Sequence, residues 1–158
     1  MINILSQVSI IEYARKADIK KGLNDRFKEI YPHVELSLTK LDKTKRKLYE
    51  VATEQHLDLA AVAYAYVYFE KLVLMGKVNK SVRRPVAGVC LLLAAKFVLD
   101  LKRKEISDLI EEIADNFRLS SRELLLYEFP VLAVLQFSLL TPNHQARFHH
   151  EKLLHAAT

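Results

Sequence analysis

The feature that most constrains this sequence is an uncharged apolar run from Pro85 to Ala95, which ends at Lys96. The run is too short to cross a bilayer, which requires about twenty apolar residues, so no membrane partner is expected. A helix without a polar face is buried on all sides by neighbouring helices. The small residue Gly88 and the alanines of the run would let those neighbours approach closely. The sequence therefore predicts a central helix over residues 81–100 of a helical bundle.

Four further segments repeat apolar residues at helical spacing, and no segment alternates like a strand over more than a few residues. These helices are expected at residues 38–55, 59–75, 104–117 and 120–139. Shorter patterns outside them predict helices at residues 9–17, 18–30 and 143–155. The fold class is accordingly all-α, with five core helices and extra helical segments at both ends.

Local signals mark where some of these helices begin and bend. Thr39, with Asp42 three residues later, is a weak variant of the capping box and is expected to open the first core helix. Ser120 and Glu123 form a capping box of the S-x-x-E type and are expected to open the fifth. Within that helix Pro130 predicts a kink, because its ring removes a backbone donor and crowds the preceding turn.

Length, cysteine content and charge limit the class of protein. The 158 residues suit one domain, and Cys90 alone can form neither an intramolecular disulfide nor a cysteine-based zinc site. We therefore expect an intracellular protein of the nucleus, the cytoplasm or both, with Cys90 as a small core residue. The net charge of +5 suits nucleic acid, an acidic partner or simple solubility. Basic residues concentrate at 40–47, 77–84 and 102–104, and acidic residues at 108–115.

No constellation of residues indicates catalysis, a cofactor or a metal. The three glycines of the chain are isolated, so none forms a phosphate-binding loop. The one string that resembles a metal motif comprises His149, His150, Glu151 and His155. Two histidines four residues apart can face one zinc ion, but His150 and His155 are five apart. A solvated surface is expected there, and the chain is not expected to be an enzyme.

Two charged residues lie on otherwise apolar helical stripes. Lys96 shares a stripe with Val89 and Leu99, and Glu128 shares one with Leu124. An unpaired buried charge is costly enough to be rare, so both positions need an explanation. The lysine could extend to water, the two charges could pair with each other, or both could lie at an apolar surface that a partner completes.

Five short strings make the sequence resemble the cyclin box, and among cyclin-like proteins it is similar to the Cables family of Cdk and Abl enzyme substrates. They are YFEKL at 68–72, LLLAAKF at 91–97, FRL at 117–119, REL at 122–124 and EFPVL at 128–132. The resemblance covers residues 36–142 and implies one cyclin-box domain. Residues 1–35 would then be an N-terminal helical extension and residues 143–158 a C-terminal helical segment.

The resemblance implies that the domain docks a cyclin-dependent protein kinase and regulates or tethers it as an adaptor. In cyclins, a lysine late in the third helix and a glutamate in the fifth contact the mobile helix of the kinase. Those roles would fall to Lys96 and Glu128. The surrounding contacts would come from Leu93, Phe97, Arg122, Leu132, Phe137 and Leu139. A tyrosine kinase would be contacted through regions outside this chain.

The chain also departs from cyclins in two places. Val98 and Leu99 follow the lysine-phenylalanine pair, where typical cyclins have two acidic residues. The first core helix reads KRKL at 45–48 and lacks the methionine-arginine-alanine-isoleucine-leucine patch that recruits substrates. Recruitment of substrates by that patch is therefore not expected.

Two other functions remain open at the level of the sequence. Cyclin folds also occur in transcription factors, so a basic nucleic-acid-binding module is the alternative, although nucleic acid is the less favoured partner. A structural scaffold is a third, and it would bind through the basic first core helix without using Lys96.

Overall fold

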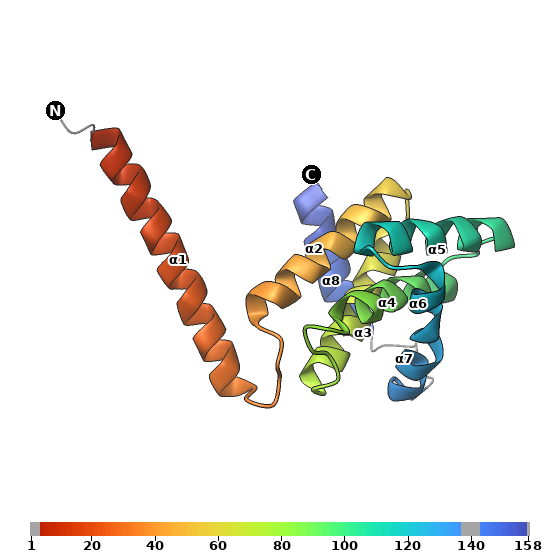
Figure 1. Cartoon of the computed structure of the whole chain (residues 1–158). Helices are drawn as coiled ribbons and strands as arrows, with labels where there is room; N and C mark the ends of the chain where they lie inside the picture. Colours follow the sequence, from red (N-terminus) through yellow and green to blue (C-terminus); the bar gives the residue numbers. More distant parts are fainter. Residues whose placement is uncertain (1–3, 137–142, 158) are drawn as a thin grey trace.

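The computed structural model describes residues 4–136 and 143–157, with side chains over 15–136 and 147–156, and its elements are all helices (Figure 1). In chain order these are α1 (Ile4–Ile30), α2 (Leu38–Glu54), α3 (Leu59–Leu74), α4 (Arg83–Val98), α5 (Arg103–Phe117), α6 (Ser121–Leu126), α7 (Glu128–Val134) and α8 (Asn143–Ala157). The predicted all-α class is confirmed. None of the helices in the described ranges is both long and apolar enough to span a membrane.

Helix α4 is the centre of the fold, as its uncharged run predicts. Every residue from Pro85 to Ala95 is buried, and α2, α3, α5, α6 and α7 all pack against the helix. At Gly88 the approach is especially close. A Cβ atom there would lie 2.7 Å from Cγ2 of Ile113 in α5 and 2.8 Å from Cδ1 of Leu124 in α6. The missing side chain therefore lets two helices pack on the same point of α4.

The start of α2 differs from the prediction. The N-cap is Ser37, whose extended backbone lies outside the helix and whose side chain accepts from the backbone N–H of Lys40 at 3.3 Å. The prediction that Thr39 and Asp42 open this helix is wrong, because Thr39 already lies inside the first turn. Its backbone N–H instead donates to Oδ1 of Asn24 at 3.0 Å, which ties α1 to α2.

The fifth core helix is two helices rather than one kinked helix. Helix α6 ends at Leu126, Tyr127 is the cap, and α7 begins at Glu128, so the break lies three residues before Pro130. In this arrangement Pro130 occupies the first turn of α7, where a backbone N–H would have no partner inside the helix. The predicted end of this helix at residue 139 lies outside the described residues.

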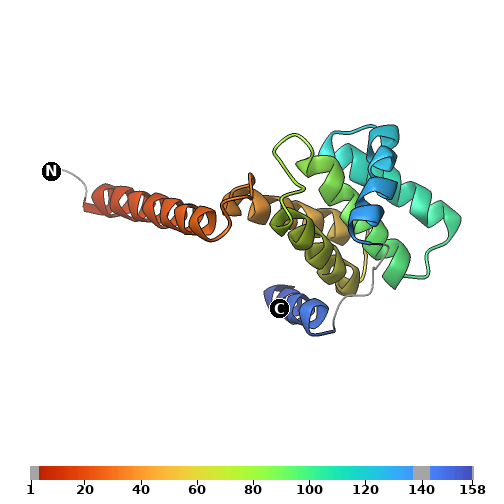
Figure 2. The same cartoon turned by 90° about the horizontal axis from the view of Figure 1, so that it is seen from below.

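The two terminal helices behave differently. Residues 9–17 and 18–30 form one continuous helix, α1, because no glycine, proline or cap interrupts them near residue 17. Figure 2 shows α1 projecting from the bundle, and its packing is against α2. Helix α8 instead lies along α3, with Leu153 buried. The division of the chain at residues 35 and 142 stays a prediction.

Candidate interaction surface

The two charged residues on apolar stripes meet at the surface. Lys96 lies in the last turn of α4 and Glu128 in the first turn of α7. The Lys96 ammonium donates to Oε1 of Glu128 at 2.5 Å, with the two side chains 34% and 27% exposed. Of the three explanations that the sequence left open, the structure displays pairing. The pair lies at the edge of the core, where both groups still reach solvent.

Helix dipoles hold both charges in place. A cation is stabilised at the C-terminal end of a helix and an anion at the N-terminal end, each by about 0.3–1 kcal/mol. Lys96 and Glu128 satisfy both conditions, because Lys96 lies in the last turn of α4 and Glu128 in the first turn of α7. The two charges are therefore oriented before any partner arrives.

The start of α6 helps to fix the position of α7, because the two helices are separated only by Tyr127. The capping box predicted at Ser120 and Glu123 is confirmed: the Ser120 N–H donates to Oε2 of Glu123 at 2.9 Å, and the Glu123 N–H donates to the Ser120 hydroxyl at 3.1 Å. The hydrogen bonds from Ser120 lower the pKa of the Glu123 carboxyl below its usual value. The Glu123 carboxyl therefore stays ionised, as the box requires, to a lower pH than an ordinary glutamate does.

Large apolar side chains are exposed on α4 and α7, which carry this ion pair, and on α6, which precedes α7. Phe97 is 45% exposed and packs edge-on against Tyr64 of α3, with ring centroids 6.0 Å apart. Phe129, next to Glu128, is 68% exposed. Leu125 and Leu126 at the end of α6 are also exposed. We call the set Lys96, Phe97, Leu125, Leu126, Glu128 and Phe129 the Lys96–Glu128 surface.

The structure places the remaining predicted site residues as follows. Leu93 is only 4% exposed and belongs to the core of α4. Leu132 is half-buried and packs on that core, and Arg122 is exposed on α6. Phe137 and Leu139 lie outside the described residues. The structure thus brings Lys96 and Glu128 together, with Phe97 exposed next to Lys96 in the sequence.

Sequence reasoning missed three apolar members of the surface. Leu125 and Leu126 follow the buried Leu124, and Phe129 follows Glu128. A signal was present, because three consecutive leucines in a helix point in directions about 100° apart and cannot all face one core. Leucines that cannot face the core in such a run are expected to form an exposed apolar strip.

A second polar cluster joins α8 to the bundle and corrects the prediction for His149. Its side chain is 12% exposed rather than solvated, and its Nε2 lies 3.0 Å from Oε2 of Glu70. The Lys45 ammonium donates to Oε1 of the same glutamate at 2.5 Å. Burial alone would raise the pKa of Glu70, but the hydrogen bonds from His149 and Lys45 lower it below its usual value. Glu70 is therefore held as a carboxylate between two helices.

Neither this cluster nor Cys90 has the features of a reactive centre. Within the part of the chain that the structure describes, no three histidine, cysteine, aspartate or glutamate side chains gather as a metal site would require. Cys90 is fully buried in α4, as expected for a core residue, and burial raises the pKa of its thiol. A thiol held in this way is a poor nucleophile.

Comparison with known proteins gives a consistent result. The family described as "Cyclin, N-terminal domain" matches residues 9–140. The chain is 44% identical over 150 residues to human "CDK5 and ABL1 enzyme substrate 1" and 42% identical over 145 residues to mouse "CDK5 and ABL1 enzyme substrate 2", which are Cables proteins. These alignments cover 94% and 92% of this chain but only 24% and 30% of the relatives. No solved structure gives a significant match.

Proposed function

Because this chain belongs to the cyclin N-terminal domain family, we propose that it is a non-catalytic adaptor module that docks a cyclin-dependent protein kinase. The observation that carries the proposal is the Lys96–Glu128 surface, where an oriented ion pair lies beside exposed apolar side chains. Aromatic side chains are enriched at the centres of protein interfaces, and a charged pair beside them would fix the orientation and identity of the partner. The module would act inside the cell, in the nucleus, the cytoplasm or both.

The ion pair keeps unused hydrogen-bonding capacity. A lysine ammonium has three donors and a carboxylate has two acceptor oxygens, whereas the pair is joined by the one contact from Nζ to Oε1. The remaining groups of Lys96 and Glu128 could bind backbone carbonyl and N–H groups of a kinase. Phe97 and Phe129 would exclude water around them, which strengthens each polar contact.

The names of the relatives support a kinase as the partner, since both are described as enzyme substrates of CDK5 and ABL1. Docking would regulate the kinase if the surface bound one position of its mobile helix better than another. Docking with equal affinity for every position would tether the kinase without changing its activity. A tyrosine kinase partner would be contacted by regions outside this chain.

The test is calorimetric titration of the chain with a panel of purified cyclin-dependent kinases. At least one should bind, and Lys96→Glu or Glu128→Lys should each weaken binding by about 2 kcal/mol or more, roughly thirtyfold. A matched control is Glu151→Lys, because Glu151 pairs with Arg147 on the exposed side of α8, away from the surface.

The charge-swapped double variant, Lys96→Glu with Glu128→Lys, separates docking from a structural role. It can still form an internal ion pair but presents the opposite polarity to a kinase. Binding should therefore stay weak in the swapped protein, with thermal unfolding used to confirm that it is folded. Full recovery of binding would show that the pair is merely structural, and failure of every kinase to bind would end the proposal.

A further inference from the structure

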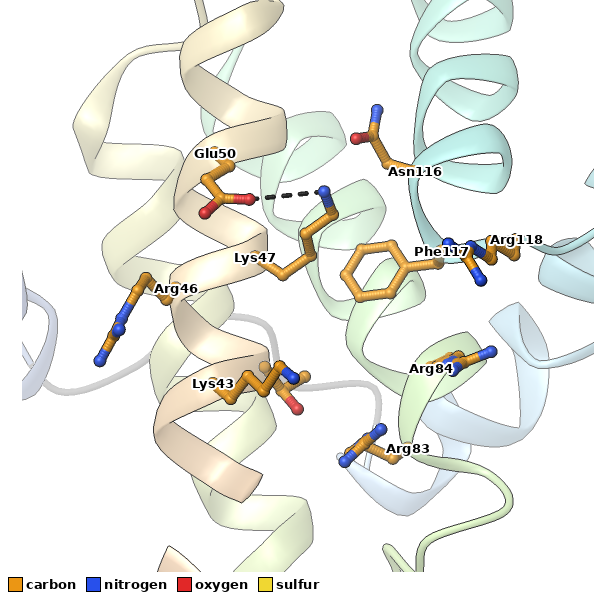
Figure 3. A pocket seen from close by; sticks show the side chains of 10 residues that line it. Lys43, Arg46, Lys47, Glu50, Arg83, Arg84, Asn116, Phe117 and Arg118 are labelled. Carbon is orange, nitrogen blue, oxygen red and sulfur yellow. Dashed lines mark hydrogen bonds and ion pairs between the residues drawn. The ribbon is translucent and has the colours of Figure 1, made fainter. Parts of the chain in front are cut away.

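A basic pocket lies at the opposite end of α4 from Lys96. It has a volume of about 470 Å³ and opens between α2, the start of α4 and the end of α5. Six cations line it, of which one is Arg46 and the other five are Lys43, Lys47, Arg83, Arg84 and Arg118. Figure 3 shows Lys43 extending from α2 toward Arg83 and Lys47 directing its ammonium toward Glu50, whereas Arg46, which also contributes to the lining, directs its guanidinium away from the other cations. We call the five cations the basic pocket.

The pocket is poor in compensating negative charge. Its lining includes one carboxylate, Glu50, which pairs with Lys47 at 3.4 Å. No ion pair joins Lys43, Arg84 or Arg118 to a carboxylate among the described residues. Like charges held close together repel one another and lower stability. An anion bound among them would remove that repulsion.

Arg83 carries a hydrogen-bond donor that is not satisfied. Its Nη1 is fully buried and has no hydrogen-bond partner among the described residues. Figure 3 shows its guanidinium in the space between Lys43 and Arg84. A buried donor without a partner costs about 1–3 kcal/mol, and such groups in native proteins call for an explanation. Arg83 also lines the pocket, so a ligand there would meet the guanidinium through atoms other than the buried Nη1.

The start of α4 adds to the positive potential. Its N-cap residue, Val82, has no side chain that could cap the helix, although the Asn79 side chain accepts from the Val82 backbone N–H at 3.1 Å. The positive end of the helix dipole therefore lies beside the pocket, next to Arg83 and Arg84. The dipole, the arginines and the lysines all favour the same ligand charge.

The rim of the pocket is acidic, which limits the shape of that ligand. The side-chain amide of Asn116 at the rim donates to Oε1 of Glu112 at 3.1 Å and lies 3.4 Å from Oε2 of Glu54. Glu50 lies on the same side (Figure 3). A nucleic-acid backbone would carry its successive phosphates past these carboxylates and be repelled. A single compact anion would avoid them.

We propose that the basic pocket binds the phosphate of a phosphoserine or phosphothreonine in a partner protein. A phosphate monoester carries close to two negative charges and three acceptor oxygens, which suits several arginine donors better than one carboxylate does. The pocket is also large enough to admit a side chain rather than only a surface contact. The proposal is independent of kinase docking, because it uses none of the residues of the Lys96–Glu128 surface.

The experiment measures fluorescence anisotropy of a labelled degenerate peptide pool with a central phosphoserine, titrated with the whole chain. The same pool with serine or glutamate at the centre, and a labelled mixed-sequence DNA duplex, are measured alongside. The phosphorylated pool should bind at least about tenfold more tightly than the other two pools and the duplex. Equal binding of all pools, or tighter binding of the duplex, would overturn the proposal.

Arg83→Gln is the decisive variant and Arg103→Gln its matched control. Arg83→Gln should weaken phosphopeptide binding about tenfold or more, because it removes a charge-assisted donor. Its thermal unfolding temperature should be unchanged or higher, because a buried unpaired donor has been removed. Arg103→Gln, at the exposed start of α5 and so at the other end of that helix from the pocket, should bind as the wild type does. Loss of folding in Arg83→Gln with unaltered peptide affinity of the folded fraction would assign Arg83 a structural role and refute the proposal.

Discussion

Replacing Gly88 with alanine should destabilise this protein, although the same change inside most helices is stabilising. The new Cβ would lie 2.7 Å from Cγ2 of Ile113 and 2.8 Å from Cδ1 of Leu124. Carbon atoms in proteins pack about 3.5–4.0 Å apart, so both neighbours would have to move. Neither has room to do so, because Ile113 and Leu124 are themselves fully buried.

The expected magnitude is the difference of two opposing effects. Alanine is favoured over glycine by about 1 kcal/mol in a helix interior, because it restricts the unfolded chain. Inserting a methyl group into a well-packed core costs about 1–3 kcal/mol. The overlap at Gly88 involves two helices at once, α5 and α6. We therefore place the cost toward the upper end and expect a net loss of about 1–2 kcal/mol.

Urea unfolding followed by circular dichroism measures this difference, and Gly22→Ala is the matched control. Gly22 lies in α1 with nothing within 4 Å of the position of a Cβ, so only the helix propensity applies there. Gly22→Ala should leave the free energy of unfolding unchanged or raise it by up to about 1 kcal/mol. Gly88→Ala should shift the midpoint to lower urea with the slope unchanged.

A Gly88→Ala protein at least as stable as the wild type would refute this reasoning. It would mean that α5 and α6 can move away from α4 at little cost, so that Gly88 does not fix their spacing. The consequence would extend to the surface, because α6 leads directly into α7 and Glu128. The distance from Lys96 to Glu128 would then no longer be set by close packing on α4.

Two further predictions concern buried polar groups. Hydrogen bonds lower the pKa of Glu70 below its usual 4.5, so the stability that the cluster contributes is present above that pH and is lost as the pH falls through the folded-state pKa. Glu70→Gln should therefore be less stable than the wild type at pH 7 and should lose less stability in acid. Urea unfolding at a series of pH values measures both effects, and identical pH profiles of the two proteins would contradict the prediction. Because Cys90 is buried and burial raises the pKa of its thiol, the folded protein should react with Ellman's reagent only as fast as it unfolds. Rapid labelling in the absence of denaturant would show instead that Cys90 is accessible.

The core of the fold could be predicted from the sequence because burial there depends on one helix alone. A run without any polar residue, Pro85–Ala95, has no face that could point to water, so its central position follows without knowledge of its neighbours. The capping box at Ser120 is similarly local, since both partners lie within one turn. Signals of this kind do not require the tertiary arrangement to be known.

Features that depend on contacts between distant residues could not be predicted in the same way. His149 has the polarity of a surface residue, and only the packing of α8 on α3 brings it to Glu70, 79 positions earlier. The break at Tyr127 depends on how α6 and α7 each pack against α4, whereas Pro130 indicates only that some irregularity is near. Pairing of Lys96 with Glu128 was one of three explanations, because stripe positions give no distance between two helices.

The basic pocket could not be predicted from the sequence either, because it too depends on contacts between distant residues. The sequence places its cations in separate clusters at residues 40–47 and 77–84, with Arg118 isolated from both. Net charge could not distinguish a nucleic-acid track from a compact anion site. That distinction depends on the concave shape and on the acidic rim near Asn116, both of which appear only when α2, α4 and α5 come together.

The two proposed sites lie at opposite ends of one buried helix, and this separation favours tethering. Arg83 opens α4 and Lys96 lies in its last turn, so at 1.5 Å per residue they are about 20 Å apart along the axis. A helix packed on all sides resists deformation, so occupancy at one end has little means of altering the other. A kinase and a phosphorylated protein bound together would instead be held at a fixed separation, where their encounter depends on effective concentration. Under the two proposals, the rigidity of α4 favours tethering of the two partners, whereas regulation would require the kinase itself to change conformation at the Lys96–Glu128 surface.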